Sequence, residues 1–220
     1  MVPRNKHSLF SLSRLTFLLF CFIIICVGLA YKPIGRSPLD EILRSNRQQL
    51  KPVIKHPDRY RLQIIYTQID RDAQNNPSFT TYRFHQNDQL YFYPASSVKM
   101  PTAFLALEKI NNLQTQGLNR ETPMFTNADR VPQTSVTQDT TAANGMPSVA
   151  QYIRKIFAVS DNDAYNRLYE FVGQRALNQT LYAKGFGHTR ITCRLDAPQF
   201  LPIDNQITNG IYFKDHGQIV

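Results

Sequence analysis

Ser96 and Lys99 stand three residues apart in the segment YPASSVKM, residues 93–100. On a helix this spacing places two side chains on one face, one turn from each other. A serine hydroxyl is a weak nucleophile until a neighbouring base takes its proton, and a lysine amine does so when burial or nearby positive charge lowers its pKa. The pair is therefore a candidate nucleophile and base. The alternative for the pair alone is a helix start with an exposed lysine.

A second polar group, Ser160-Asp161-Asn162, begins 64 residues after Ser96. It stands between two segments with helical apolar spacing, residues 147–159 and 164–172. Serine, aspartate and asparagine are all favoured at helix ends, because their side chains hydrogen-bond to unpaired backbone groups. Taken alone, the tripeptide favours a helix cap, and a site shared with Ser96 and Lys99 is the alternative.

The elements that must position these two groups begin with a leader helix and two strands. Ser37-Pro38 is typical of an N-cap followed by proline at the first helical position, and we expect a helix of about 13 residues that ends at Pro52. Residues 61–70 (RLQIIYTQID) and 79–85 (FTTYRFH) are rich in β-branched and aromatic residues, which predicts an antiparallel pair. The aromatic run at residues 90–93 is also strand-like.

Helices are expected to follow. After Ser96 apolar residues recur at helical spacing, and we expect Pro101 to cost one hydrogen bond or to bend this helix. The apolar positions are Ala103, Phe104, Leu107, Ile110 and Leu113. Residues 118–146 are mostly polar and predict a loop, before further helices at 147–159, 164–172 and 174–184. Strands followed by helices predict an α+β fold, although two strands are a small sheet for so many helices.

Residues 1–30 are typical of an export signal. Three basic residues precede an almost wholly apolar run at residues 17–29, and Gly28-Leu29-Ala30 is similar to a small-residue cleavage site. The run is short for a membrane span, which needs about 20 residues. We predict cleavage and export, with an uncleaved membrane anchor as the alternative. Lipidation at Cys26 is a third alternative, disfavoured because Ile25 stands where a small residue is usual.

The formal charge of the 220 residues is +9, and the basic residues are scattered rather than clustered with aromatics, so we expect no nucleic-acid partner. Cleavage after Ala30 leaves Cys193 as the lone cysteine of the mature chain, and we expect it to be a small buried residue rather than a nucleophile. The five histidines are dispersed, without the spacing of a zinc motif. The sequence therefore predicts no metal and no cofactor.

S-x-x-K followed by S-D-N belongs to the signature set of class A β-lactamases and penicillin-binding proteins. The chain resembles this superfamily from residue 59 onward, through the segments around Ser96 and Ser160 and a loop that opens with Arg194-Leu195-Asp196. The resemblance implies a β-lactamase/transpeptidase-like fold of the α+β class and a covalent acyl intermediate on Ser96.

The resemblance also implies a role for each residue of the two groups. Ser96 would attack a carbonyl carbon, with its own backbone N–H as one oxyanion donor, and Lys99 would accept or position the hydroxyl proton. Ser160 would relay a proton to the departing amine nitrogen. Asn162 would hydrogen-bond both the substrate's side-chain amide and Lys99.

Two parts of the family pattern are not found in the sequence. There is no K-T-G or K-S-G, so we expect the strand that carries it, the rest of the sheet and the last helix to be missing from a C-terminally truncated product. In class A enzymes a glutamate in an E-x-x-L-N loop activates the deacylating water. Counting without gaps from Arg194 places Gln199 there, and an amide cannot act as a general base. Glu170, the only glutamate after Asn162, is expected on a helix.

We therefore predict an exported bacterial serine hydrolase, periplasmic or membrane-anchored, acting on a small molecule such as a β-lactam or a related amide. Residues 31–58 are expected to be a linker and leader helix, and residues 59–220 an incomplete catalytic domain. A D-Ala-D-Ala peptidase or penicillin-binding protein acting on cell-wall peptides is the alternative within this class. A non-catalytic remnant or binding module, able to dimerise through an open sheet edge, is the alternative outside it.

Overall fold

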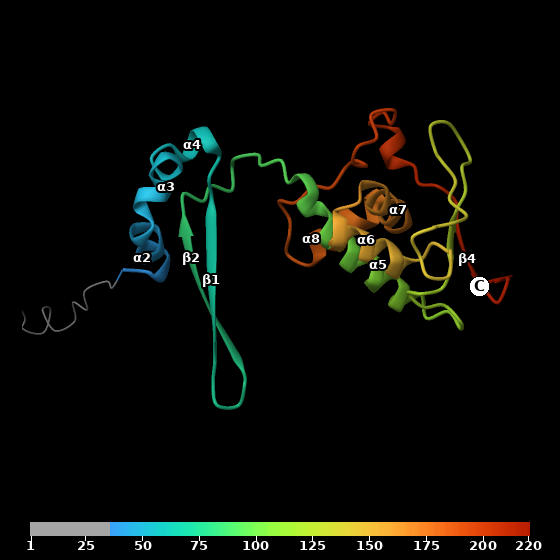
Figure 1. Ribbon diagram of the computed structural model, residues 1–220, viewed down its shortest axis with the longest axis horizontal. Helices are drawn as coiled ribbons and strands as arrows, with labels where there is room; N and C mark the ends of the chain where they lie inside the picture. The colour runs from blue at the N-terminus through green and yellow to red at the C-terminus, as the bar shows by residue number, and fades with distance from the viewer. Residues whose placement is uncertain (1–35) are drawn as a thin grey trace, which may run out of the picture. The chain divides into compact units, whose positions relative to one another are not determined.

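The computed structural model describes residues 36–220, and the chain divides into two compact units, the first ending at Leu90 and the second comprising Tyr91–Val220 (Figure 1). The predicted export signal, residues 1–30, lies outside the described residues. Both units contain helices and strands, which agrees with the predicted α+β class. Within residues 36–220, no helix is long and apolar enough to cross a membrane.

The first unit opens with α2 (Pro38–Ser45). Ser37 is its N-cap, as predicted, and forms a capping box: its hydroxyl accepts a hydrogen bond from the Asp40 N–H (3.1 Å), and the Asp40 carboxylate accepts one from the Ser37 N–H (3.3 Å). These bonds satisfy backbone donors that the first turn leaves unpaired.

The predicted single leader helix is wrong, because the chain breaks after α2 and continues as α3 (Arg47–Ile54) and α4 (Pro57–Tyr60). Asn46 lies at the break, and its side-chain amide donates to the Ile42 carbonyl (2.9 Å), a local bond that competes with helix continuation. Pro52 does not end a helix but lies inside α3.

The first unit also contains the predicted hairpin. Strand β1 (Ile64–Arg71) pairs antiparallel with β2 (Pro77–Phe84), from Ile64 opposite Phe84 to Arg71 opposite Pro77. The predicted strand at residues 90–93 is wrong, because these residues have no regular structure and are exposed.

The second unit is built around four helices: α5 (Lys99–Leu113), α6 (Val149–Val159), α7 (Asn162–Val172) and α8 (Gln174–Ala183) (Figure 1). Helix α7 contacts the other three. Its residues Ala164, Tyr165, Leu168 and Tyr169 are fully buried in the core of this unit. The first turn of α7, which carries Asn162, therefore belongs to the helix with the most buried residues in the described part of the chain.

Helix α5 follows a short 3₁₀ turn, η1 (Ala95–Val98). Its core contacts come from Ala103, Leu105, Ala106 and Ile110. Phe104 is 56% exposed, so the predicted apolar face is partly wrong. Pro101, where we expect a lost hydrogen bond or a bend, is the third residue of α5. A missing N–H costs little in the first turn, where no helical partner precedes it.

Residues 118–146 are mostly loop, as predicted, but they contain β3 (Met124–Thr126). This strand pairs antiparallel with β4 (Ile211–Asp215), which pairs with β5 (Gln218–Ile219). Met124 lies opposite Phe213, and both are buried in the core. The three-stranded sheet was not predicted, because β3 and β4 are short and lie far apart in the sequence.

Candidate active site

Lys99, the first residue of α5, reaches both ends of the Ser160-Asp161-Asn162 turn. Its Nζ donates to the Ser160 hydroxyl (3.0 Å), to the Asn162 side-chain carbonyl oxygen (2.6 Å) and to the Ser160 backbone carbonyl. Lys99 is 3% exposed. A lysine ammonium has three N–H donors, so all three are engaged. The two groups predicted from the sequence thus meet at this amine.

The turn is held by its own backbone. Ser160 ends α6 in a left-handed conformation (φ 55°), and its N–H donates to the Ile156 carbonyl (3.0 Å). Asp161 is the N-cap of α7, where its carboxylate accepts from the Ala164 N–H (2.8 Å). Asp161 thus caps the helix, as the first interpretation expects, while Ser160 and Asn162 accept hydrogen bonds from Lys99.

Ser96 lies in η1, one turn before Lys99, whose backbone N–H donates to the Ser96 carbonyl. Its side chain is exposed, and among residues 36–220 its hydroxyl has no hydrogen-bond partner. The neighbouring Ser97 differs, because its hydroxyl donates to the Pro94 carbonyl (2.6 Å). Ala95 has a left-handed φ of 45°, a conformation that is uncommon for residues other than glycine. Ser96 is thus the serine of this turn whose hydroxyl is open to a reagent.

Burial lowers the pKa of the Lys99 ammonium, and the Asp161 carboxylate opposes this by favouring the charged form. The negative charge of the Asp161 carboxylate is in turn partly offset by the ammonium group of Lys155, whose Nζ lies 3.7 Å from Asp161 Oδ2. Loss of one proton from Lys99 would leave two N–H donors and a lone pair. The amine can then hold two of its present partners and accept a proton from a third group.

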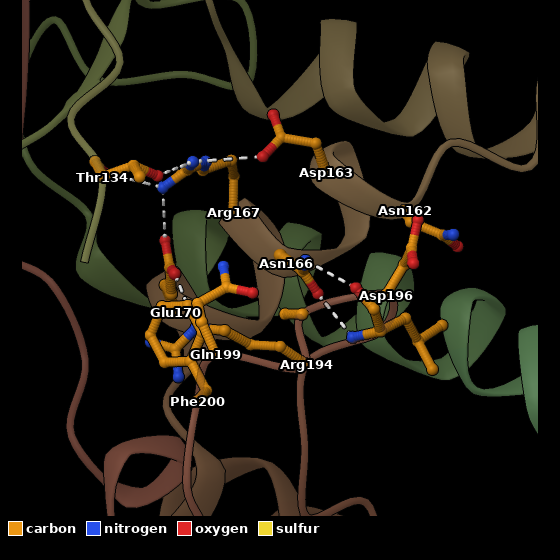
Figure 2. A pocket seen from close by; sticks show the side chains of 12 residues that line it. Thr134, Asn162, Asp163, Asn166, Arg167, Glu170, Arg194, Asp196, Gln199 and Phe200 are labelled. Atoms are coloured by element: carbon orange, nitrogen blue, oxygen red, sulfur yellow. Dashed lines mark hydrogen bonds and ion pairs between the residues drawn. The ribbon is translucent and has the colours of Figure 1, made fainter. Parts of the chain in front are cut away.

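A cavity of about 170 Å³ lies beside this site (Figure 2). Helix α7 lines it with Asn162, Asp163, Asn166, Arg167 and Glu170. The loop that begins at Arg194 lines the other side and includes Asp196, Gln199 and Phe200. Gln199, placed at the catalytic glutamate position by gapless counting, is an exposed residue of this wall. Asn162 belongs both to this cavity and to the contacts of Lys99.

Glu170 lies on α7, which confirms its predicted helical position. Its carboxylate accepts hydrogen bonds from Arg167 Nη1 (3.1 Å) and Arg194 Nε (2.8 Å), and all three residues are buried. Burial acts to lower the pKa of Arg167, but the Glu170 and Asp163 carboxylates outweigh it and raise that pKa. In this ion network the Glu170 carboxylate is bound by two guanidinium groups.

Arg194 joins the loop to α7. Besides Glu170, it donates to the backbone carbonyls of Asp204 (3.1 Å) and Ile207 (3.1 Å), and its guanidinium lies 4.1 Å from the centre of the Phe200 ring. Asn166 adds a second attachment: its side chain donates to the Leu195 carbonyl (2.9 Å) and accepts from the Leu195 N–H (2.8 Å). The loop is therefore fixed against α7 at two successive residues.

Sequence reasoning missed Arg167 and Asn166. The signal was present in their spacing, because Asp163, Arg167 and Glu170 recur at helical intervals, and Asn166 follows Asn162 by one turn. The prediction for Cys193 is wrong, since this residue is exposed. In the described part of the chain, no three His, Cys, Asp or Glu side chains gather to hold a metal ion.

A family model described as the β-lactamase enzyme family matches residues 46–213, which is most of the chain. No curated protein and no solved structure gives a significant match. The family carries β-lactamase-like hydrolase activity on small molecules. On this match, the chain belongs to the β-lactamase enzyme family.

Proposed function

We propose that the protein is a serine hydrolase that is acylated at Ser96 by β-lactams or related amides and then hydrolyses the acyl-enzyme. The observation that carries this proposal is the buried Lys99 amine, bonded to the side chains of Ser160 and Asn162 and one turn from the open Ser96 hydroxyl. A nucleophile, a base and a second hydroxyl within one site are what acyl transfer from an amide requires.

The steps follow from these contacts. Neutral Lys99 takes the proton of Ser96 Oγ as this oxygen bonds to the carbonyl carbon, and the Ser96 backbone N–H stabilises the negative oxygen that develops. Lys99 then gives a proton to Ser160 Oγ, which passes its own to the amine nitrogen as the C–N bond breaks. Lys99 returns to the neutral form, and Ser96 carries the acyl group.

Asn162 binds substrate through the half of its amide that Lys99 leaves available. Its Oδ1 accepts from Lys99 (2.6 Å), so its NH₂ group remains to donate to a substrate carbonyl. This division supports a substrate with an amide carbonyl beside the reacting bond.

Adjacent serines provide a matched test. Ser96→Ala should abolish penicillin hydrolysis, whereas Ser97→Ala should retain most of it, because the Ser97 hydroxyl is bound to the Pro94 carbonyl. Circular dichroism melts should show that both variants fold. Hydrolysis retained by Ser96→Ala would overturn the nucleophile assignment.

A second candidate is a peptidase that acts on D-Ala-D-Ala cell-wall peptides. The observation in its favour is Gln199, an amide on the wall of the cavity next to Asn162, since an amide cannot activate water as a base. Turnover of penicillin and of a D-Ala-D-Ala peptide by the same preparation decides between them. Faster peptide turnover, with penicillin left as a stable adduct, would favour the peptidase.

A further inference from the structure

Lys155, on α6, lies between two carboxylates that come from different segments of the chain. Its Nζ is 3.5 Å from Asp139 Oδ2, in the loop before α6, and 3.7 Å from Asp161 Oδ2, at the start of α7. Asp139 is buried, and the side chains of Lys155 and Asp161 are 23% and 25% exposed, so solvent screens these pairs only in part. Burial lowers the pKa of Lys99, and the Asp161 carboxylate opposes this by favouring the ammonium. Charges of alternating sign thus lead from Asp139 to Lys99.

Lys155 also contacts the turn through its backbone, because its carbonyl accepts a hydrogen bond from the Asp161 N–H (3.4 Å). The two oxygens of the Asp161 carboxylate have separate partners. Oδ1 caps α7 by accepting from the Ala164 N–H (2.8 Å), and Oδ2 faces the Lys155 ammonium. Removal of this ammonium would therefore keep the cap and the backbone bond and take away a charge.

Asp139 is held in place on the other side of Lys155. Its Oδ1 accepts from the N–H (2.9 Å) and from the hydroxyl (2.5 Å) of Thr141, and that hydroxyl accepts from the side-chain amide of Gln151 on α6 (3.0 Å). Burial acts to raise the pKa of Asp139, but the Thr141 bonds and the charge of Lys155 outweigh it and lower that pKa. Asp139 is therefore ionised at neutral pH, as its pairing with Lys155 requires.

The other charged groups of α7 near the turn are paired with each other. Asp163 and Glu170 both accept from the guanidinium of Arg167 (3.1 Å each). Among the described residues, the cation paired with Asp161 is Lys155. The net charge beside the turn is therefore set by Lys155 and its two carboxylates.

We propose that Lys155 is a positioning residue for acylation, which offsets the charge of Asp161 and so keeps the Lys99 amine able to give up its proton. The proposal rests on the acylation of Ser96 proposed above. Without Lys155, the unopposed Asp161 carboxylate stabilises the Lys99 ammonium, and an ammonium cannot accept the Ser96 proton. Asp139 limits the effect, because its own negative charge offsets part of the charge of Lys155.

The test is the pH dependence of the acylation burst with a chromogenic cephalosporin, followed by rapid mixing. Lys155→Met should slow acylation by about three-fold or more below the Lys99 pKa and leave it within about two-fold above that pKa, where Lys99 is neutral in either protein. The rise of the rate with pH thus moves to higher pH. Asp139→Asn should move it to lower pH, because the amide oxygen keeps the Thr141 bonds and the charge is lost. Lys155→Arg keeps the charge and should behave as wild type.

Arg154→Met is the matched control. Arg154 precedes Lys155 on the same helix, but its guanidinium donates to Glu121 (2.7 Å), and both side chains of this pair are exposed. The variant loses the same charge and should keep the wild-type pH dependence. An equal movement in Arg154→Met would overturn the proposal, because the effect would then follow the net charge of the protein rather than the pair with Asp161.

Each remaining outcome decides a separate claim. A folded Lys155→Met protein, checked by its thermal melt, whose rate rises over the wild-type pH range would overturn the role of Lys155 and leave acylation in place. Slowing by one factor at every pH would also overturn it, because that is the mark of a purely structural defect. If Lys155→Met does not fold, an Asp139→Asn profile that is unchanged or moved to higher pH would overturn the proposal. Absence of a burst in folded wild-type protein would overturn the proposed function itself, and this role with it.

Discussion

Lys99 is subject to two opposed demands. Three oxygen atoms accept hydrogen bonds from its Nζ, which favours the ammonium, while burial favours the neutral amine and lowers the pKa. The balance keeps the amine able to change its protonation state in the site, as a base in acyl transfer must. Lysine suits this position because its pKa moves readily on burial, whereas the guanidinium of arginine stays charged.

The pH dependence of acylation follows from that balance. Only neutral Lys99 accepts the Ser96 proton, so the acylation rate should rise with pH and level off above the Lys99 pKa, which burial places below 10.5. Stopped-flow acylation rates between about pH 6 and pH 10 measure this rise of the rate with pH. Lys99→Arg should lower the acylation rate by about 100-fold or more and remove its rise with pH, because arginine does not lose its proton in this range. An unchanged profile in Lys99→Arg would contradict the role of the amine.

Tyr152 provides a test of stability that is separate from catalysis. It is 1% exposed in the core, and its buried hydroxyl has no hydrogen-bond partner among the described residues. An unpaired buried hydroxyl costs about 1–3 kcal/mol, so Tyr152→Phe should leave the free energy of unfolding unchanged or raise it by up to this amount. Urea denaturation measures the difference. A loss of more than about 1 kcal/mol would show that the hydroxyl has a partner in solution.

At the scale of elements, the hairpin, the four long helices and the junction at Ser160 could be predicted, because periodicity and capping residues are local signals. The contact of Lys99 with the Asn162 side chain could be expected only from the family resemblance, since it joins two helices across the core. The pairing of β3 with β4 could not be predicted at all. Met124 and Phe213 meet through tertiary packing, and neither short segment has a strand pattern of its own.

The packing of the Arg194 loop against α7 could not be predicted for the same reason. Arg194 could be read as the start of a loop, but its buried pairing with Glu170 depends on how a distant segment folds back onto the helix. The prediction of a single leader helix failed for a different reason. Asn46 and Pro52 are both common helix breakers, and the chain breaks at the first and continues through the second.

The ion network of this loop predicts a large effect on stability. The Glu170 side chain is 2% exposed between Arg194 (1%) and Arg167 (6%), so Glu170→Gln would leave two buried guanidinium groups without their shared carboxylate. Breaking a buried ion pair costs about 3–5 kcal/mol. Urea denaturation should show a loss of this order.

Asp163 is the internal control for that experiment, because it pairs with the same Arg167 from a side chain that is 58% exposed. Exposed pairs contribute about 1 kcal/mol or less, so Asp163→Asn should have a small effect. Similar losses for the two variants would mean that burial does not set the strength of this network.

At the scale of the whole molecule, the chain passes from one compact unit to the other at residues 90 and 91. Tyr91, Phe92 and Tyr93 are 77%, 56% and 57% exposed and have no regular secondary structure. Exposed backbone without regular hydrogen bonds is where proteases cut first. The aromatic residues at this passage are thus expected to be the most accessible chymotrypsin sites in the described part of the chain.

Brief digestion with chymotrypsin should therefore release a fragment that begins at residue 92 or 93 and ends at Val220, as mass spectrometry can show. Tyr182 is the comparison site, because it is 69% exposed but lies in α8, where the backbone is hydrogen-bonded. Cleavage at Tyr182 before cleavage at residues 91–93 would mean that the backbone of α8 is more accessible to the protease than the segment between the two units.

The central claim, that Ser96 becomes acylated, is tested most directly by locating the bound acyl group. Wild-type protein is quenched in acid shortly after mixing with benzylpenicillin, digested, and mapped by tandem mass spectrometry. We predict one penicilloyl group per chain, on Ser96, and none when Lys99→Arg protein is treated for the same time. A folded protein with no adduct, or an adduct on Ser97 or another residue with Ser96 unmodified, would contradict the account.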